Sequence, residues 1–166
     1  MAHDGSLASQ VEAWIVTQIE ALAPFADRNV EAFAGSTEKM GEKLIAEMMA
    51  GKGSPFVVVM FEGDRPIPLE EGAQAYEPIY GIYVLVQNAR PGVARMGETV
   101  GATTTYGTNG IRDLLRNALH DKSPDLGANG FYTDQTTFRG VRVVFQRTDM
   151  FVMRAELIVR ETIAAA

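Results

Sequence analysis

The chain has 166 residues, 46 % of them hydrophobic and 22 % charged, which is the composition of a single globular domain rather than of a disordered or fibrous protein. A net charge of −6 and a pI near 4.9 oppose tight binding of nucleic acid, because phosphate contacts draw mainly on clustered lysine and arginine. The absence of cysteine excludes disulfides, thiolate nucleophiles and Cys-based metal sites, and no apolar run approaches the ~20 residues of a membrane helix.

The N-terminal region predicts a helix followed by a short strand. Ser9 and Glu12 have the spacing of a capping box, and apolar residues then recur at helical intervals until Pro24 ends the run. Residues 28–34 predict a short extended segment. Residues 1–9 lack the basic start and apolar core of a signal peptide, so we expect a cytoplasmic product.

The middle of the chain predicts a second helix and two buried strands. The helix spans residues 36–51. Pro55 to Glu62 and Tyr76 to Asn88 are apolar on both faces, which is typical of central strands. Gly63 to Gly72 is acidic and contains two prolines, which predicts an exposed loop between two antiparallel strands. Pro78 is expected at the start of its strand or at a bulge.

The C-terminal half predicts a loop, a helix and a hairpin. Ala89 to Gly107 is rich in Gly and Thr, and part of it is expected to be a mobile arm. A third helix follows, with its apolar stripe at Ile111, Leu114, Leu115, Ala118 and Leu119. Asp121 to Gln135 predicts another loop, and Val141 to Ile163 predicts a long β-hairpin. The order α-β-α-β-β-α-β-β predicts one α+β domain over residues 1–166, with a largely antiparallel sheet flanked by helices.

Three groups of residues invite a chemical interpretation, and each has a simpler structural one. His120, Asp121 and Asp125 match no metal-ligand spacing and fit the end of a helix and its loop. Residues 51–54 resemble a phosphate loop but follow a helix, whereas such a loop follows a strand. The acidic residues of 62–71 lack the order of a calcium loop and fit a solvated charge run. No catalytic, cofactor or metal residue is therefore nominated.

The hairpin is the most informative segment because its two faces differ. Alternation along a strand places one row in the core: Phe151, Met153, Ala155, Leu157 and Val159. The other face mixes apolar residues with charges, which is typical either of a surface that meets another chain or of a solvated sheet face. This face is the candidate subunit interface: Arg142, Val144, Gln146, Val152, Arg154, Glu156, Ile158 and Arg160. Alanine at both Arg154 and Glu156 is expected to weaken assembly and leave the fold intact.

The element order and two segments carry a resemblance to a known family. These segments are Tyr106 to Leu115 (YGTNGIRDLL) and Phe151 to Leu157 (FVMRAEL). Through the element order and these two segments, the chain from Trp14 onward resembles the tail-terminator proteins of long-tailed bacteriophages. Among these proteins, it is more similar to the Mu-type lineage of prophage tail proteins.

The resemblance implies a β-sheet flanked by helices and a hexameric ring without enzymatic activity or cofactor. Such a ring ends growth of the tail tube and joins the tail to the head. The implied partners are copies of the chain itself, the tail-tube protein and the head–tail connector protein, with DNA passing through unbound and no membrane contact. The implied location is the virion tail, after synthesis in the bacterial cytoplasm. The arm that would dock on the tube carries Arg90, Val93, Arg95, Met96 and Tyr106.

Two alternatives remain open on the residues alone. One is a small enzyme with a site around Tyr76, Tyr83 and Arg112, although no spacing supports it. The other is a monomeric binding module that uses the methionines of the second helix, Met40, Met48 and Met49, because methionine side chains adapt readily to a partner.

Overall fold

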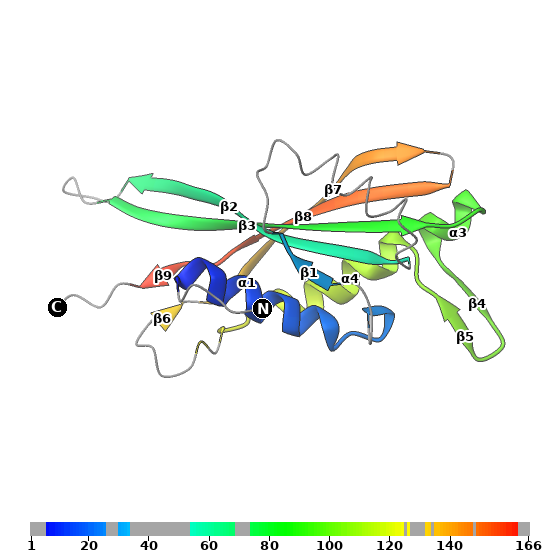
Figure 1. Cartoon of the computed structure of the whole chain (residues 1–166), viewed down its shortest axis with the longest axis horizontal. Coiled ribbons are helices and arrows are strands. Elements are labelled where there is room, and N and C mark those ends of the chain that lie inside the picture. The colour runs from blue at the N-terminus through cyan, green and yellow to red at the C-terminus, as the bar shows by residue number, and fades with distance from the viewer. Residues whose placement is uncertain are drawn as a thin grey trace.

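A computed structural model describes residues 6–25, 30–33, 54–68, 74–124, 126, 132–133, 135–147 and 149–162 (Figure 1). The elements in chain order are α1 (Leu7–Glu20), the 3-10 helix η1 (Ala23–Phe25), β1 (Val30–Ala32), β2 (Phe56–Pro68), β3 (Gln74–Gln87), α3 (Pro91–Met96), β4 (Glu98–Val100), β5 (Thr103–Thr105), α4 (Thr108–Leu119), β6 (Tyr132–Thr133), β7 (Thr137–Arg147), β8 (Met150–Ile158) and β9 (Glu161–Thr162).

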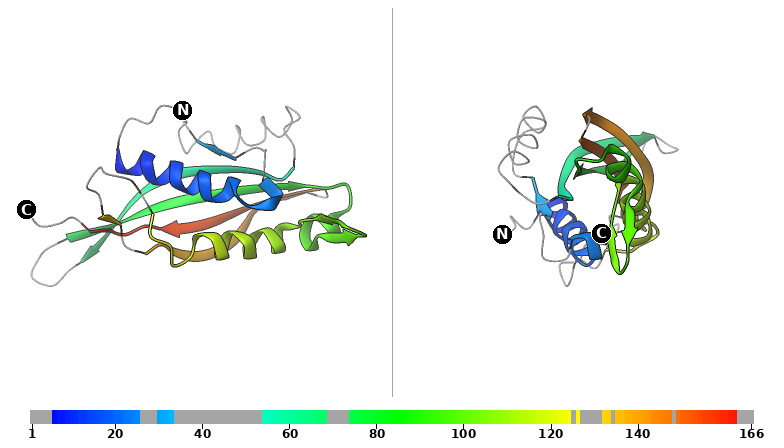
Figure 2. Two further views of the ribbon diagram at one scale, coloured as in Figure 1. Left: turned by 90° about the horizontal axis from the view of Figure 1, so that it is seen from below. Right: turned by 90° about the vertical axis from the view of Figure 1, so that its right-hand side faces the viewer.

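Five of the described strands form the main sheet, in the order β1-β2-β3-β8-β7. All neighbours are antiparallel except β1 and β2, which are parallel. Figure 2 shows α1 and α4 side by side on one face of this sheet, which curves around them. The fold is thus α+β with a mostly antiparallel sheet and helices on one face, which confirms the predicted class. The arm adds elements that the predicted order lacked: α3 and the β4–β5 hairpin.

The helix-covered face of the sheet, called the inner face below, carries the main core. Leu115 and Leu119 of α4 and Ile15 of α1 are fully buried against the central strands, because both helices turn their apolar stripe toward the sheet. The sheet contributes Val57, Val59, Tyr80, Ile82, Val84, Val86, Phe151, Met153, Ala155, Leu157 and Val159 to this cluster. The third predicted helix and the predicted inner row of the hairpin are therefore confirmed.

The opposite face of the sheet, called the outer face, carries a second buried cluster. Its members are Phe33, Phe56, Val58, Met60, Leu85, Met150 and Val152, with Tyr83 packed against them. They alternate along β2, β3 and β8 with the residues of the main core, as the pleat requires. The prediction that β2 and β3 are apolar on both faces is confirmed.

Helix α1 begins three residues before the predicted capping box. Ser6 is the N-cap, and its Oγ accepts a hydrogen bond from the backbone N–H of Ser9 at 3.2 Å. The Glu12 carboxylate accepts instead from the backbone N–H of Phe61 on β2 at 2.5 Å. The predicted Ser9–Glu12 box is wrong, because Glu12 ties the helix to the sheet rather than to its own first turn.

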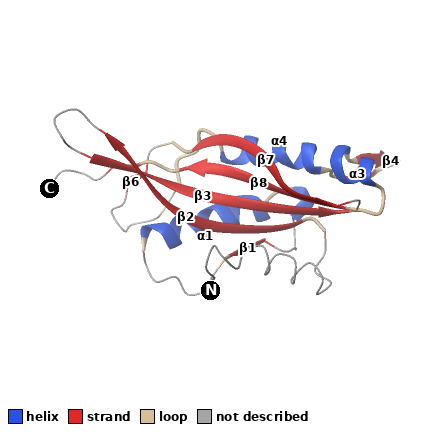
Figure 3. Ribbon diagram, turned by 90° about the horizontal axis from the view of Figure 1, so that it is seen from above, coloured by secondary structure: helices blue, strands red, loops and turns tan. Residues whose placement is uncertain are grey.

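The predicted loop from Gly63 to Gly72 is also wrong over its first half. Strand β2 continues to Pro68 and β3 already begins at Gln74, so the two strands form a hairpin that extends beyond the rest of the sheet (Figure 3). A register shift between Phe61 and Gly63 leaves Glu62 as an extra residue, and Pro78 lies near this bulge, opposite Asp64. The predicted second helix, residues 36–51, lies outside the described residues.

The expected mobile arm, residues 89–107, contains regular structure held at its base by two glycines. An added Cβ at Gly107 would overlap the backbone of Gly97, and one at Gly97 would lie 2.7 Å from the carbonyl oxygen of Thr105. Gly97 also has φ +76° and ψ 177°, a region that only glycine readily adopts. The two ends of the β4–β5 hairpin therefore cross backbone against backbone, and glycine at positions 97 and 107 is explained by this close packing.

We expect Gly97→Ala to lower the free energy of unfolding by about 3–5 kcal/mol, because backbone strain and a steric clash add. Gly101, at the tip of the β4–β5 hairpin, is a matched control: its φ is also positive, at +62°, but an added Cβ meets nothing within 4 Å. Gly101→Ala should lower the free energy of unfolding by only about 1–2 kcal/mol. Urea unfolding measures both values, and equal losses would contradict the close crossing at Gly97.

Candidate functional site

An ion-paired network on the outer face joins three strands beside the apolar cluster. The Glu62 carboxylate, at the β2 bulge, accepts hydrogen bonds from Arg154 Nε of β8 at 2.9 Å and from the Tyr83 hydroxyl of β3 at 2.6 Å. A second Arg154 nitrogen also contacts Glu62, and Nη1 reaches Glu156 at 3.2 Å. The Arg154 side chain is only 11 % exposed. All three nitrogens of its guanidinium group thus contact carboxylates of the same subunit.

Gly81 makes room for this network. It lies on β3 between Met60 of β2 and Glu156 of β8. A Cβ at this position would overlap the Glu62 carboxylate and lie 2.7 Å from the Tyr83 ring. The carboxylate therefore occupies the space that a side chain at position 81 would fill.

The network fixes the charge state of each member near neutral pH. Burial raises the pKa of Glu62, but hydrogen bonds from Arg154 and Tyr83 outweigh it, so the net pKa is lowered. Burial and the neighbouring Glu62 carboxylate raise the pKa of Tyr83 to about 12. The hydrogen bond to Glu62 raises the pKa of Arg154 further. General acid–base catalysis favours a pKa near the working pH, so these shifts suit a structural network and not a catalytic one.

A second cluster lies further along the outer face, around one buried carboxylate. Glu77 of β3 is 3 % exposed. It pairs with Arg65 of β2, with Arg160 Nη2 at 3.0 Å and, more distantly, with Arg139 Nη2 of β7 at 3.8 Å. The hydrogen bond from Arg65 lowers the pKa of Glu77, against the effect of burial, and Arg160 lowers it further. Three guanidinium groups therefore converge on one carboxylate.

The predicted interface residues do not all lie on the outer face. Arg142 lies opposite Arg154 on the outer face, but a register shift between Val143 and Phe145 reverses the alternation beyond it. Gln146 consequently pairs with Phe151 of the inner row, which separates it from the outer-face set. Val144 stays exposed beside the shift, and so do Val143 and Phe145, which the sequence pattern missed.

Two further predicted interface residues lie buried within the subunit. Val152 is 4 % exposed and Ile158 is 1 % exposed, so they have little area left to offer a partner. Truncation of Arg154 would leave the Glu62 carboxylate partly buried without its main partner, which is destabilising. The expectation that alanine at Arg154 leaves the fold intact therefore does not fit this network, and Arg142 is the better residue to substitute.

The arm carries the residues that the sequence nominated for docking. Met96, the last residue of α3, is 68 % exposed, and Val100, the last residue of β4, is 67 % exposed. The Arg90 guanidinium pairs with Glu98 at 2.5 Å, Arg95 is exposed and Val93 is half-buried. Tyr106 packs against the main core. The arm thus presents an apolar surface at Met96 and Val100, while Tyr106 anchors its base.

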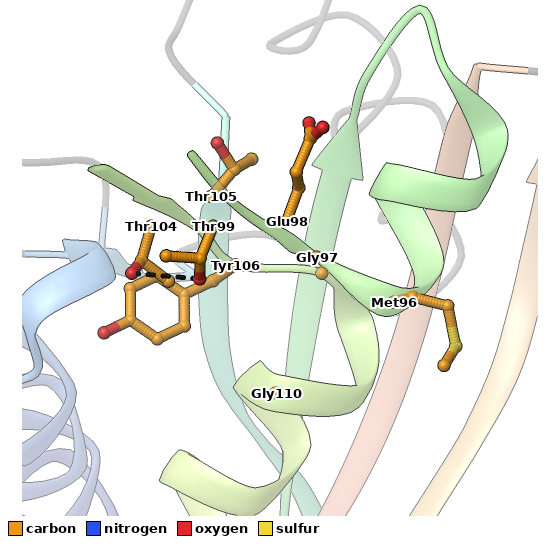
Figure 4. Close-up of a pocket in the computed structure, with 9 residues that line it drawn as sticks. Met96, Gly97, Glu98, Thr99, Thr104, Thr105, Tyr106 and Gly110 are labelled. Carbon is orange, nitrogen blue, oxygen red and sulfur yellow. Dashed lines mark hydrogen bonds between the residues drawn. The ribbon is translucent and has the colours of Figure 1, made fainter. Parts of the chain in front are cut away.

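A shallow pocket of about 330 Å³ lies beside this base, as Figure 4 shows. Residues 96–99, 104–107 and 110 line it. The hydroxyl groups of Thr99 and Thr104 lie 3.4 Å apart next to the Tyr106 ring, and Met96 points away from them. Threonine hydroxyls without an adjacent base are not activated nucleophiles, so this lining does not suggest a reaction.

The residues of the enzyme alternative do not come together. Tyr83 lies on the outer face, whereas Arg112 lies on α4 over the inner face and pairs with Asp113. His120 ends α4 and accepts a hydrogen bond at Nδ1 from the backbone N–H of Phe138. Asp125 and the methionines of the binding-module alternative lie outside the described residues. Within the described ranges, no group of three or more His, Asp or Glu residues could hold a metal ion, and no helix is long and apolar enough to cross a membrane.

Comparison with known proteins gives a fold relationship and no sequence family. No family model matches the sequence, and no curated protein matches it significantly. Among solved structures, the chain is similar to a component of the "Virion of native gene transfer agent (GTA) particle". The TM-score is 0.52 at 12 % identity, and the match covers 95 % of this chain and 98 % of that one. The two chains therefore share their fold over nearly their whole lengths.

The two clusters predict how stability depends on pH. The pKa values of Glu62 and Glu77 are lowered from 4.5 in the folded state, so the unfolded state binds more protons in that range. The stabilisation is fully present above the unfolded value and is lost as pH falls through the folded values. We expect the free energy of unfolding in urea to fall between about pH 6 and pH 3. Glu62→Gln and Glu77→Gln should each reduce this dependence, and an unchanged dependence in both variants would contradict the assignment.

Proposed function

We propose that this chain is a structural component of a phage-like virion and has no enzymatic activity. The observation that carries the proposal is the fold shared with a gene transfer agent virion component over 95 % of this chain and 98 % of that one. The charge network on the outer face supports a structural role as well, because its carboxylates are held ionised by arginines rather than tuned for proton transfer.

More specifically, we propose that residues 1–166 form one tail-terminator domain that assembles as a ring, a hexamer by the family resemblance. The ring would cap the tail tube, end its growth and form the junction with the head connector. A closed ring uses two unlike surfaces on each subunit. The chain offers such surfaces, because the β2–β3 hairpin projects beyond one end of the sheet (Figure 3), and β7 forms an edge of that sheet with no further described strand beside it.

The arm is the proposed contact with the last tube ring. Its exposed residues Met96 and Val100 lie away from the main core, on elements held by the crossing of Gly97 and Gly107. Exposed apolar side chains on an ordered backbone favour binding to another protein, because little conformational entropy is lost when they are buried. The acidic chain is proposed to let DNA pass without specific binding.

Electron microscopy of the purified chain, alone and mixed with the tail-tube protein of the same phage or prophage, tests the proposal. We expect rings, and tubes of limited length with a ring at one end. Met96→Asp should leave the rings intact and abolish capping, because burial of a carboxylate at the contact is unfavourable. Asn117→Asp, at an exposed position of α4, adds the same charge away from the arm and from β7 and should leave docking on the tube unchanged. Tubes of equal length with and without the chain would refute the proposed function.

A further inference from the structure

A groove on the outer face follows the edge strand β7. It has a volume of about 400 Å³ and is lined by Arg139, Gly140, Val141, Arg142, Arg154 and Glu156. Gly140 lies opposite Glu156, and an added Cβ at position 140 would meet nothing within 4 Å. The space above Gly140 is therefore open, and arginines border it on both strands. This set of six residues is called the basic groove below.

The groove belongs to a patch with more positive than negative charge. Five arginines gather on this part of the outer face, Arg65, Arg139, Arg142, Arg154 and Arg160, against three carboxylates, Glu62, Glu77 and Glu156. The chain as a whole carries −6. This patch therefore carries two more positive than negative charges, although the protein as a whole is acidic. The amino-acid composition alone does not reveal this local difference.

Arg142 and Arg139 hold this excess. Arg142 lies directly opposite Arg154, and like charges at paired positions of a sheet repel. Arg154 is neutralised by Glu62 and Glu156, whereas no described residue forms a hydrogen bond or ion pair with Arg142. Arg139 reaches Glu77 only at 3.8 Å and is 42 % exposed. Both guanidinium groups thus have N–H donors for which the described residues supply no close acceptor.

We propose that the basic groove binds carboxylate side chains of a second copy of this chain, as one half of the subunit contact in the proposed ring. The inference rests on the proposed function. Charge complementarity supports it, because the remainder of the chain is acidic and brings carboxylates to the groove.

The neighbouring apolar residues favour a protein partner over nucleic acid. Val144 and Phe145 follow the groove on β7 and are 43 % and 36 % exposed, and Phe145 lies opposite Val152 of the outer-face cluster. Apolar area beside arginine is typical of protein–protein contacts, whereas DNA contacts are dominated by charge. Strand β7 pairs only with β8 among the described strands, so a second subunit can approach from its other side.

Sedimentation velocity at increasing sodium chloride, with the doubly substituted chain Arg139→Glu/Arg142→Glu, tests the proposal. The wild-type oligomer should weaken as salt rises, because screening removes the ion pairs. The variant should associate roughly tenfold or more weakly at low salt and should lose most of the salt dependence. Arg112→Glu/Arg116→Glu, at two exposed arginines of α4, changes the net charge by the same amount, so it is the control and should associate like the wild type. Circular dichroism confirms that each variant is folded.

Three outcomes overturn the inference. The first is unchanged self-association of the folded double variant, and the second is a wild-type chain that is monomeric at every concentration. The third is binding of the wild-type chain to double-stranded DNA that the double variant loses while its self-association is unchanged, which would assign the groove to nucleic acid. The proposed function fails separately: salt-sensitive rings that never cap a tail tube would leave the basic groove in place and refute the capping role.

Discussion

Strand β3 is apolar on both faces, and the remaining structure depends on covering both. Tyr80, Ile82 and Val84 face α1 and α4, where two amphipathic helices bury them completely. On the outer face Leu85 lies in the second apolar cluster, but Gly81 and Tyr83 lie under the Glu62–Arg154 pair. The outer face is therefore apolar near one end of β3 and ionic further along the strand.

The ionic part contributes more to geometry than to net stability. Desolvation of a buried ion pair offsets much of its attraction, so an apolar replacement of similar shape is often equally stable. Breaking the pair is costly, however, since one charge then stays partly buried alone. Glu62, Tyr83 and Arg154 come from three different strands, and their hydrogen bonds hold the β2 bulge in register with β3 and β8. The surface that these three strands form on the outer face is thus preorganised for the binding of a partner.

Periodicity predicted the elements well and the outer face poorly, for a physical reason. The apolar stripe of α4, the two doubly apolar strands and the inner row of β8 are local patterns, each read within about ten residues. A bulge adds one residue and reverses every later side chain, so the shift at Val144 misplaced Gln146 and concealed Phe145. A second shift in β7, between Phe138 and Gly140, did have a local signal, because a glycine inside a strand pattern indicates a bulge. The Glu62–Arg154 pair spans 92 residues, a separation that no local pattern reaches.

The arginines of β7 have two physical roles that do not compete. An edge strand with open N–H and C=O groups invites uncontrolled pairing, and charged side chains along such an edge discourage it. Arg139, Arg142 and Arg147 give β7 this protection, since another basic strand is repelled. The same charges attract a surface that brings carboxylates at matching positions. An acidic chain with one basic edge thus disfavours contact between two identical edges and favours contact between unlike surfaces. Unlike contact is what closure of a ring requires.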